Sequence, residues 1–485
     1  MTDALVKPSS RWFWVYCLIL FAILVRLFSL GLYPLMDTSE ARYGEIVRLM
    51  VETNDWIIPY FDYGVPFLGK PPLFIWLSAI SFKLFGINEF AARLPSLVCG
   101  IGTLALVWKL ARFQMGKQQA NISVLFLITS ASFMVLSGAV LADPVMTLTI
   151  TLILCGFWIG WHSENASEAR RWQYLFFAGC GLALLAKGLA ALVLAGGPIF
   201  LWCLPKGRLI TLWHRFPWIK GTVLAAAIAL PWYISAEIRN PGLLEYMFIG
   251  EHFSRYLDSG WDGDEYGNAH VHPLGSIWGY LLLGGFPWTF VLMGAVITQL
   301  WKGWRKKPTL KLQEWDYFLL CWLLFLPVFF TFTANLIWTY TLPVMPALAL
   351  IIARLFGENW PDHSRKLIAL ATLTPLLMIA TTVVMMNDGG KKSQKYLIES
   401  MTAHTVEQPG HLIYFLKRPF SARFYSHGQA LLANSEEEIS NQLHDDRRDF
   451  LATRDGNINI LSESLRDRFE KVSEYRNWTL WVEKE

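Results

Sequence analysis

The stretch PLMDTSEARYGEIVRLMVETNDWIIPYFDYGVPFLGKPP, residues 34–72, is a polar segment in an otherwise very apolar N-terminal half. It is rich in charged residues, among them Asp37, Glu40 and Lys70, and it directly follows an apolar run at residues 12–33. That run is long enough to cross a membrane. Ionisable groups held beside a membrane usually face a cavity or a pathway. This stretch is therefore the first candidate for a functional site.

The composition indicates a membrane protein with several spans. Of the 485 residues, 54% are hydrophobic and only 16% are charged, whereas a soluble domain has about 25% charged residues. The net charge of +4 is small, so no nucleic-acid partner is expected. Apolar runs of near-membrane length recur along the first 386 residues and predict an α-helical polytopic domain there.

We expect eleven apolar spans, each with boundaries uncertain by a few residues. They fall at 12–33, 90–112, 119–138, 142–161, 172–187, 188–204, 216–236, 275–299, 315–333, 338–356 and 365–386. The region 172–204 is too long for one span, and basic loops flank it on both sides. We therefore predict two short spans that meet near Lys187 and Gly188.

The loops between these spans alternate in character. Every second loop is basic, as at Arg170 and Arg171 or at Lys206 and Arg208, and the positive-inside rule places this set in the cytoplasm. The other set carries ionisable residues at the ends of apolar helices. Its members include Asp37, Glu40, Lys70, Asp143, Lys187, Glu251, His252, Arg255, Asp262, Asp264, His270 and His272. Their gathering on one side predicts a site on the outer face of the membrane.

Two helices and a further domain complete the expected organisation. Residues 39–52 have an amphipathic period and residues 71–85 are apolar, so both are expected to lie at the membrane interface within an external loop at 34–89. From residue 387 to 485 the chain becomes hydrophilic. Strands are predicted at 411–416, 421–426, 450–454 and 477–482, with a helix at 436–445. This part is expected to be a small α/β domain on the outer side.

Several of these stretches together resemble one known family. DTSEARYGEIVRLM at 37–50, FLGKPPLFIWLSAISFKLFG at 67–86 and AARLP at 91–95 are similar to the first external loop of lipid-linked-sugar transferases. The later stretches LADPVMTLTITL, LLAKGLAALVLAGGP, EHFSRY and TYTLPVMPALALI follow in the same order. The chain thus resembles the aminoarabinose transferase and protein mannosyltransferase group, over roughly residues 12–355.

The resemblance implies a C-type glycosyltransferase membrane fold and a particular reaction. The donor would be an undecaprenyl phosphate-linked sugar, and the acceptor would be lipid A or another envelope glycan or protein. Transfer would occur by single displacement with inversion. The protein would lie in the bacterial inner membrane among membrane lipids, with the active site and the C-terminal domain in the periplasm. No cofactor and no metal are expected.

The resemblance also assigns roles to individual residues. The catalytic carboxylate of the first loop carries over to Asp37 or Glu40, and Asp143 matches a second acidic position. Residues that would hold the donor phosphate are Lys70, Lys187, Arg255 and Tyr340. These types suit the chemistry, because cations stabilise a phosphate leaving group and a carboxylate can deprotonate an attacking hydroxyl.

Structural interpretations compete with each assignment. Asp37 and Glu40 have the spacing of a helix capping box, and Asp143 could cap a helix before Pro144. Lys70 could extend from the interface towards water. His252, His270 and His272 lack a convincing ligand spacing, so a solvated loop is preferred over a metal site.

Two other function classes are also compatible with the sequence. Transfer of mannose or another hexose to protein or polysaccharide is the nearest alternative. A membrane transporter is the alternative outside enzymes, but no internal repeat is visible and the charges cluster on one face.

Overall fold

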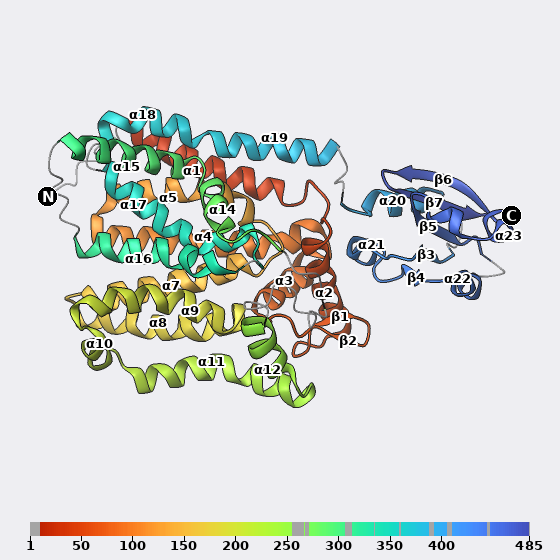
Figure 1. Cartoon of the computed structure of the whole chain (residues 1–485), viewed down its shortest axis with the longest axis horizontal. Helices are drawn as coiled ribbons and strands as arrows, with labels where there is room; N and C mark the ends of the chain where they lie inside the picture. The colour runs from red at the N-terminus through yellow and green to blue at the C-terminus, as the bar shows by residue number, and fades with distance from the viewer. Residues whose placement is uncertain are drawn as a thin grey trace.

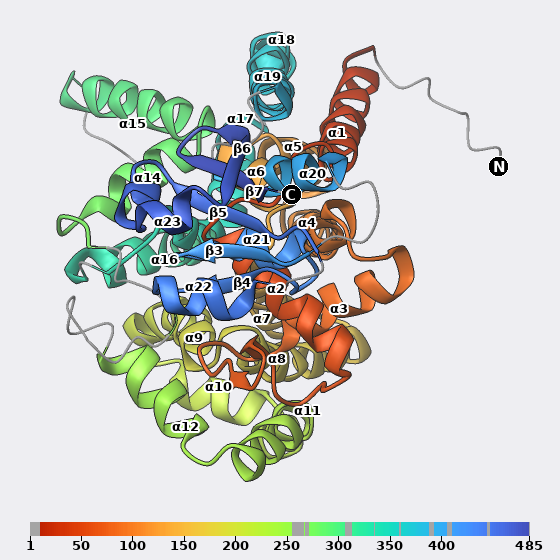
Figure 2. The ribbon, with the colours of Figure 1, turned by 90° about the vertical axis from the view of Figure 1, so that its right-hand side faces the viewer.

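The computed structural model separates a helical bundle from a small sheet domain at the C-terminus (Figure 1). It describes residues 10–254, 266, 271–305, 313–333, 335–357, 360–387, 392–404, 410–443 and 447–484. The long helices of the bundle run side by side, and the C-terminal domain lies beyond one end of them (Figure 1). Seen from that end, the sheet lies across the ends of the helices (Figure 2).

The first half of the bundle contains the predicted external loop. Its elements are α1 (Ser10–Ser29), α2 (Ser39–Thr53), β1 (Tyr60–Asp62), β2 (Val65–Pro66), α3 (Leu73–Phe85), α4 (Glu89–Met115), α5 (Lys117–Ile128), α6 (Ala131–Leu136), α7 (Asp143–His162), α8 (Ala166–Lys187) and α9 (Leu189–Cys203). The predicted interfacial helices at 39–52 and 71–85 correspond to α2 and α3. They pack against each other.

The second half of the bundle has more breaks. Its elements are η1 (Leu204–Lys206), α10 (Leu209–Arg215), α11 (Trp218–Arg239), α12 (Leu243–Glu245), η2 (Tyr246–Ser254), α14 (Ser276–Gly284), α15 (Trp288–Arg305), α16 (Glu314–Phe329), η3 (Phe330–Phe332), η4 (Trp338–Val344), α17 (Met345–Gly357), α18 (Trp360–Ala371) and α19 (Leu373–Asn387). Each of the eleven predicted spans falls on helical segments. The number that cross the membrane stays a prediction.

Length and composition mark most of these helices as membrane spans. Within the described residues, eight helical segments are long and apolar enough to cross a membrane, and the pair α14–α15 would be a ninth if it forms one span. The chain is therefore a multi-pass membrane protein. The predicted span at 172–187 covers all of α8 except its first six residues, which include Glu168, Arg170 and Arg171.

The predicted spans at 119–138 and 275–299 are both broken, and their breaks meet. The span predicted at 119–138 divides into α5 and α6 at Thr129 and Ser130, and α14 and α15 are bent by 105°. The amide of Ala131 donates to the carbonyl of Phe286 at 2.9 Å, and the Trp288 indole donates to the Thr129 hydroxyl at 3.1 Å. Groups at each break thus provide hydrogen-bond partners for groups at the other. Polar backbone and side-chain groups need such partners in apolar surroundings.

A glycine makes the sharp reversal between α8 and α9. Gly188 has a φ of 66°, which side-chain-bearing residues rarely adopt, and it separates the two helices. The helices contact each other and lie side by side (Figure 1). This agrees with the predicted pair of helices meeting at Lys187 and Gly188.

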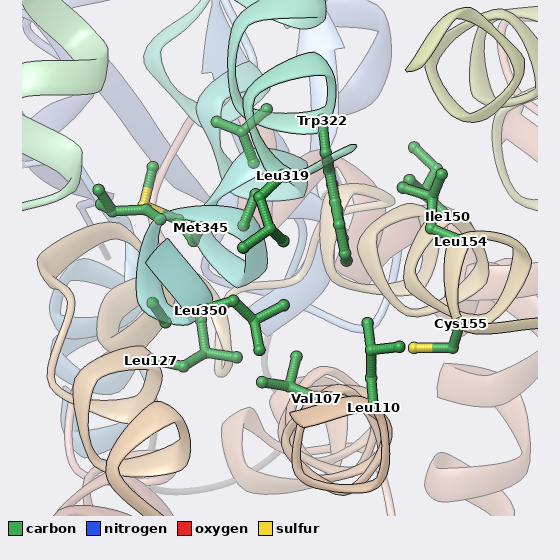
Figure 3. Close-up of a cluster of buried hydrophobic side chains, with 14 of the residues drawn as sticks. Val107, Leu110, Leu127, Ile150, Leu154, Cys155, Leu319, Trp322, Met345 and Leu350 are labelled. Carbon is green, nitrogen blue, oxygen red and sulfur yellow. The ribbon is translucent and has the colours of Figure 1, made fainter. Parts of the chain in front are cut away.

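The bundle core is a continuous set of buried side chains from α4, α5, α7, α16 and α17. Figure 3 shows Val107, Leu127, Leu154, Trp322 and Leu350 converging, one from each of these helices. Trp322 is 1% exposed, and its indole donates to the Pro343 carbonyl at 3.0 Å. A buried indole needs such a partner. This core fixes the position of η4, which carries Tyr340.

The C-terminal domain is a five-stranded mixed sheet with strand order β4-β3-β5-β7-β6. Its elements are α20 (Lys395–His404), β3 (Leu412–Phe415), α21 (Phe420–Tyr425), β4 (Leu431–Ala433), α22 (Glu436–Gln442), β5 (Phe450–Arg454), η5 (Asn457–Ile460), α23 (Glu463–Arg466), β6 (Phe469–Tyr475) and β7 (Trp478–Glu483). β3 pairs in parallel with β4 and β5, and β7 pairs antiparallel with β5 and β6. Both sheet faces are covered by apolar clusters.

The predicted strand at 421–426 is wrong. These residues form α21, which begins after Pro419 and packs on α2. A short apolar run does not distinguish a helix from a strand by periodicity alone. The other three predicted strands fall on β3, β5 and β7, and the predicted helix falls on α22.

The C-terminal domain docks on the first external loop through ion pairs. Asp62 of β1 accepts from Arg418 at 2.6 Å and lies 3.1 Å from Arg423. Lys395 binds Glu89 at 2.7 Å. The side chains of Asp62, Arg418 and Arg423 are at most 26% exposed, so solvent screens these pairs less than surface pairs.

The Asp62→Ala substitution is therefore expected to loosen this docking. Arg423 would lose its carboxylate partner in a mostly buried position, which costs about 1–3 kcal/mol. Faster limited proteolysis of the C-terminal domain in detergent would report the change. Glu470→Ala, which removes an exposed partner of Arg448, should cost only about 0–1 kcal/mol. Equal proteolysis rates for both variants would contradict the docking role of Asp62.

Candidate functional site

A cavity of about 370 Å³ lies among the ends of several helices, and we call it the central cavity. The loop before α3, the α8–α9 turn, η2, η3 and η4 all contribute to its wall. Most of the lining is apolar, with side chains such as Leu192, Val193 and Phe330. Its polar side chains are Lys70, Lys187, Glu251, Asn335 and Tyr340. An apolar cavity with a few convergent polar groups is the usual form of a ligand site.

Lys187 and Asp143 form one charged pair at this cavity. The Lys187 ammonium lies 2.9 Å from a carboxylate oxygen of Asp143, and their side chains are 14% and 5% exposed. The ammonium also lies 4.5 Å from the centre of the Tyr340 ring. Asp143 begins α7, but the N-cap position belongs to Ala142 and has no side-chain cap. The Asp143 carboxylate binds Lys187 instead, and the capping interpretation is wrong.

Lys70 and Glu251 form a second charged pair on the cavity wall. Lys70 precedes the proline pair that leads into α3, and it donates to the carboxylate of Glu251 in η2. The side chains are 21% and 5% exposed. The sequence placed Glu251 in an outer loop without giving it a role. The EHFSRY motif begins with Glu251 and is the sequence signal that could have identified this residue.

The four predicted residues Lys70, Asp143, Lys187 and Tyr340 are thus brought together although they are far apart in the sequence. Arg255, the remaining predicted phosphate ligand, lies outside the described residues. His270, Asp262 and Asp264 do as well. Across the described part of the chain, no group of three or more histidine, cysteine, aspartate or glutamate side chains could hold a metal ion.

Glu40 lies in a different environment. Its carboxylate accepts from Nε and Nη2 of Arg93 at 3.0 and 2.8 Å, and from the amide of Val140 at 3.3 Å. α2 has Thr38 as its N-cap, with no side-chain cap. The capping-box interpretation of Asp37 and Glu40 is therefore wrong. Glu40 does not line the central cavity.

Arg93 uses its remaining donors to hold the start of the external loop. It is fully buried and donates to the carbonyls of Leu30, Tyr33 and Pro34 at 2.8, 2.7 and 3.0 Å. Burial by itself would raise the pKa of Glu40, but the Arg93 guanidinium outweighs burial and lowers that pKa below 4.5. Glu40 is therefore a carboxylate at neutral pH.

Asp37 faces the C-terminal domain. Its carboxylate accepts from the amide of Ser421 at 3.0 Å and from the hydroxyl of the same residue. Its own amide donates to the carbonyl of Lys392 at 2.7 Å. Burial raises the pKa of Asp37, and the hydrogen bonds from Ser421 act in the opposite direction. Asp37 lines a second cavity, and it is not among the residues of the central one.

The central cavity thus combines an apolar wall with two lysines, each beside a carboxylate. Lysine is a point charge that suits phosphate oxygens. Each carboxylate orients the lysine beside it and offsets its charge. Such a site is able to hold a phosphate attached to an apolar chain.

Comparison with known proteins gives one consistent result. The family model of dolichyl-phosphate-mannose-protein mannosyltransferase matches residues 69–234. An undecaprenyl phosphate-alpha-4-amino-4-deoxy-L-arabinose arabinosyl transferase from Aeromonas salmonicida is 31% identical over 75% of this chain and 66% of its own length. A second such transferase from Proteus mirabilis is 32% identical over 70% of this chain and 58% of its own length.

The fold agrees with these matches. The crystal structure of ArnT from Cupriavidus metallidurans bound to undecaprenyl phosphate has a TM-score of 0.78, covers 98% of both chains and is 18% identical. The chain belongs to the aminoarabinose transferase and protein mannosyltransferase group. It has the C-type membrane fold of that group, as the motifs predicted. The chain spans about six-tenths of the length of the curated relatives that it matches first.

The ion pair between Arg93 and Glu40 is expected to contribute strongly to the free energy of unfolding. In Glu40→Gln the buried guanidinium loses its charged partner, which costs about 3–5 kcal/mol. The lowered pKa of Glu40 means that its contribution is fully present above pH 4.5 and is lost as pH falls through the lowered value. Thermal unfolding in detergent should therefore show a large difference from wild type at neutral pH, and a smaller difference in acid.

The matched control is Glu399→Gln, because that side chain is 55% exposed and lies 4.0 Å from Lys395. Its unfolding temperature should stay close to the wild-type value at every pH. A Glu40→Gln variant as stable as this control would contradict the anchoring role of Arg93 and Glu40.

Proposed function

We propose that this chain is a glycosyltransferase that takes a sugar from an undecaprenyl phosphate-linked donor. The acceptor is lipid A or a related envelope molecule at the periplasmic face of the bacterial inner membrane. The observation that carries the proposal is the pair of lysines, Lys70 and Lys187, on one apolar cavity at the ends of membrane helices. The similar transferases from Proteus mirabilis and Aeromonas salmonicida, which are named for an undecaprenyl phosphate-linked sugar, support the donor.

The lysines stabilise the leaving group in this proposal. As the bond between the anomeric carbon and the phosphate oxygen breaks, negative charge develops on the polyprenyl phosphate. Lys187 and Lys70 lie where preformed cations would offset that charge. The apolar wall, with residues such as Leu192 and Val193, accommodates the start of the polyprenyl chain. Arg255 remains a proposed phosphate ligand from its motif.

A carboxylate completes the displacement. The acceptor oxygen attacks the anomeric carbon from the side opposite the phosphate, which inverts the configuration in one step. If the acceptor is a hydroxyl, its proton passes to a carboxylate; if it is a phosphate, no proton is lost. Of the three predicted carboxylates, Asp143 is favoured for this role because it pairs with the cavity-lining Lys187, although Asp143 is not itself a lining residue. Asp37 and Glu40 bind Ser421 and Arg93 instead.

The charge distribution supports the proposed orientation. The basic loop with Lys206, Arg208 and Arg215 lies beside α10, at the end of the bundle opposite the C-terminal domain (Figure 1). Positive loops are retained in the cytoplasm. This orientation would place the C-terminal domain and the ends of α8 and η4 on the periplasmic side.

Transfer of mannose or another hexose to protein or polysaccharide is the second candidate. The match to the mannosyltransferase family model over residues 69–234 favours it. Both candidates share the lipid phosphate donor and the same lysines.

Substitution of the cavity residues tests the proposed site. Lys187→Met and Asp143→Asn should each lower the transfer rate by at least about 100-fold, the size of effect seen when one transition-state donor is removed. Transfer from undecaprenyl phosphate-linked aminoarabinose to lipid A is measured with purified protein. Lys109→Met breaks a lysine–glutamate pair outside both cavities and should leave the rate unchanged. Full activity of Lys187→Met, or a greater loss in Asp37→Asn than in Asp143→Asn, would overturn this assignment.

The acceptor is tested in cells. Mass spectrometry of lipid A from cells with and without the protein should show an added sugar mass only when the protein is present. The Lys187→Met variant serves as the inactive control. An unchanged lipid A spectrum, together with sugar added to protein or polysaccharide, would favour the second candidate.

A further inference from the structure

A second cavity lies between the external loop and the C-terminal domain, and we call it the interdomain cavity. It has a volume of about 440 Å³. Its wall combines residues from the start of the external loop, from the segment after α19 and from the edge of the sheet domain. It shares no lining residue with the central cavity.

The interdomain cavity is strongly basic. Its charged lining residues are Asp37, Lys392, Lys417, Arg418, Arg454 and Arg476, so five cations face one carboxylate. Asp37 is held by Ser421, and Arg418 binds Asp62 at 2.6 Å. Such an excess of positive charge suits an anion, and arginine can bind phosphate oxygens in a bidentate manner.

An apolar groove runs along the membrane helices that lead to this cavity. It has a volume of about 370 Å³ and lies between α1 and α19. Phe28 and Leu32 line it from the first helix and the turn after it, and Val383 and Met386 line it from α19. Among the described residues that line it, the polar side chains are Ser29 and Thr382. α1 and α19 contact each other and lead towards the C-terminal domain (Figure 1).

The chain limits how far the groove can be from the cavity. Leu32 of the groove and Asp37 of the cavity are five residues apart, and Met386 and Lys392 are six residues apart. An extended chain covers at most about 3.6 Å per residue, so these separations are below about 18 and 22 Å. The hydrogen bond from the Asp37 amide to the Lys392 carbonyl ties the two segments together. One lipid molecule could therefore span both features.

We propose that the groove and the interdomain cavity together form a second lipid site, which binds a phosphate-bearing lipid. An acyl chain lies between α1 and α19, and the phosphate lies among the cations of the cavity. Tyr475, Asn477 and Trp478 also line the cavity, and their polar atoms suit the hydroxyl groups of a glycerol head. The lipid is thus an anionic glycerophospholipid. The proposal does not depend on the transferase activity.

Native mass spectrometry of the full chain in detergent tests the site. The probes are dioleoylphosphatidylglycerol, lipid A and the zwitterionic dioleoylphosphatidylcholine. A phosphate-bearing anionic lipid should bind at least tenfold more tightly than the zwitterionic one. Phosphatidylglycerol should also bind more tightly than lipid A, and the opposite preference would overturn the assignment to a glycerophospholipid.

Charge reversal locates the head group. The double variant Lys417→Glu/Arg454→Glu should lose at least tenfold in affinity for the anionic lipid. The matched control Arg447→Glu/Lys471→Glu makes the same charge change on exposed residues of the same domain, outside the cavity, and should bind as wild type does. If the reversal disturbs folding, Lys417→Gln/Arg454→Gln replaces it. Equal affinities of the cavity variant and the control would overturn the proposal.

Two further variants separate this site from the central cavity. Val383→Trp fills the groove, and it should weaken binding of phosphatidylglycerol but not of inorganic phosphate. Lys187→Met should keep the second lipid bound, even if it abolishes transfer. Loss of the lipid in Lys187→Met with retention in Val383→Trp would place the lipid in the central cavity and contradict the second site.

Discussion

The buried guanidinium of Arg93 is the interaction on which the external loop depends. It gathers three backbone carbonyls of residues 30–34 and the carboxylate of Glu40. A fully buried cation is stable only when its donors are satisfied and its charge is matched. The loop therefore has one position relative to α1 and α4. That position determines where α2 and α3 begin, and with them where Lys70 and Asp37 lie.

The two lysines of the central cavity also have their charges matched by carboxylates. Lys70 and Lys187 come from segments more than one hundred residues apart, and each meets a carboxylate from another distant segment. The carboxylates reduce the cost of holding ammonium groups beside apolar walls. In the proposed function these two lysines supply preformed cations to the lipid phosphate, which is the preorganisation that transfer from such a donor needs.

The C-terminal domain extends this arrangement beyond the membrane helices. Its helix α21 covers α2, and its ion pairs with Asp62 and Glu89 fasten it to the loop. The same docking encloses a basic cavity above an apolar groove. The two proposed lipid sites thus share this loop. The central cavity pairs each of its two lysines with a carboxylate, whereas the interdomain cavity has an excess of positive charge.

The sequence by itself determined the membrane class, the helical positions, the turn at Gly188 and the group to which the chain belongs, because apolar periodicity, charged loops and local motifs are short-range signals. It also singled out Lys70, Asp143, Lys187 and Tyr340. Tertiary structure decided the partners: Glu40 binds Arg93, Asp37 binds Ser421, and Glu251 joins Lys70. It also made residues 420–425 a helix, through packing on α2. Ion pairing across large sequence separations leaves no periodic trace in the sequence, so only the folded chain shows which carboxylates anchor the loop and which face the cavity.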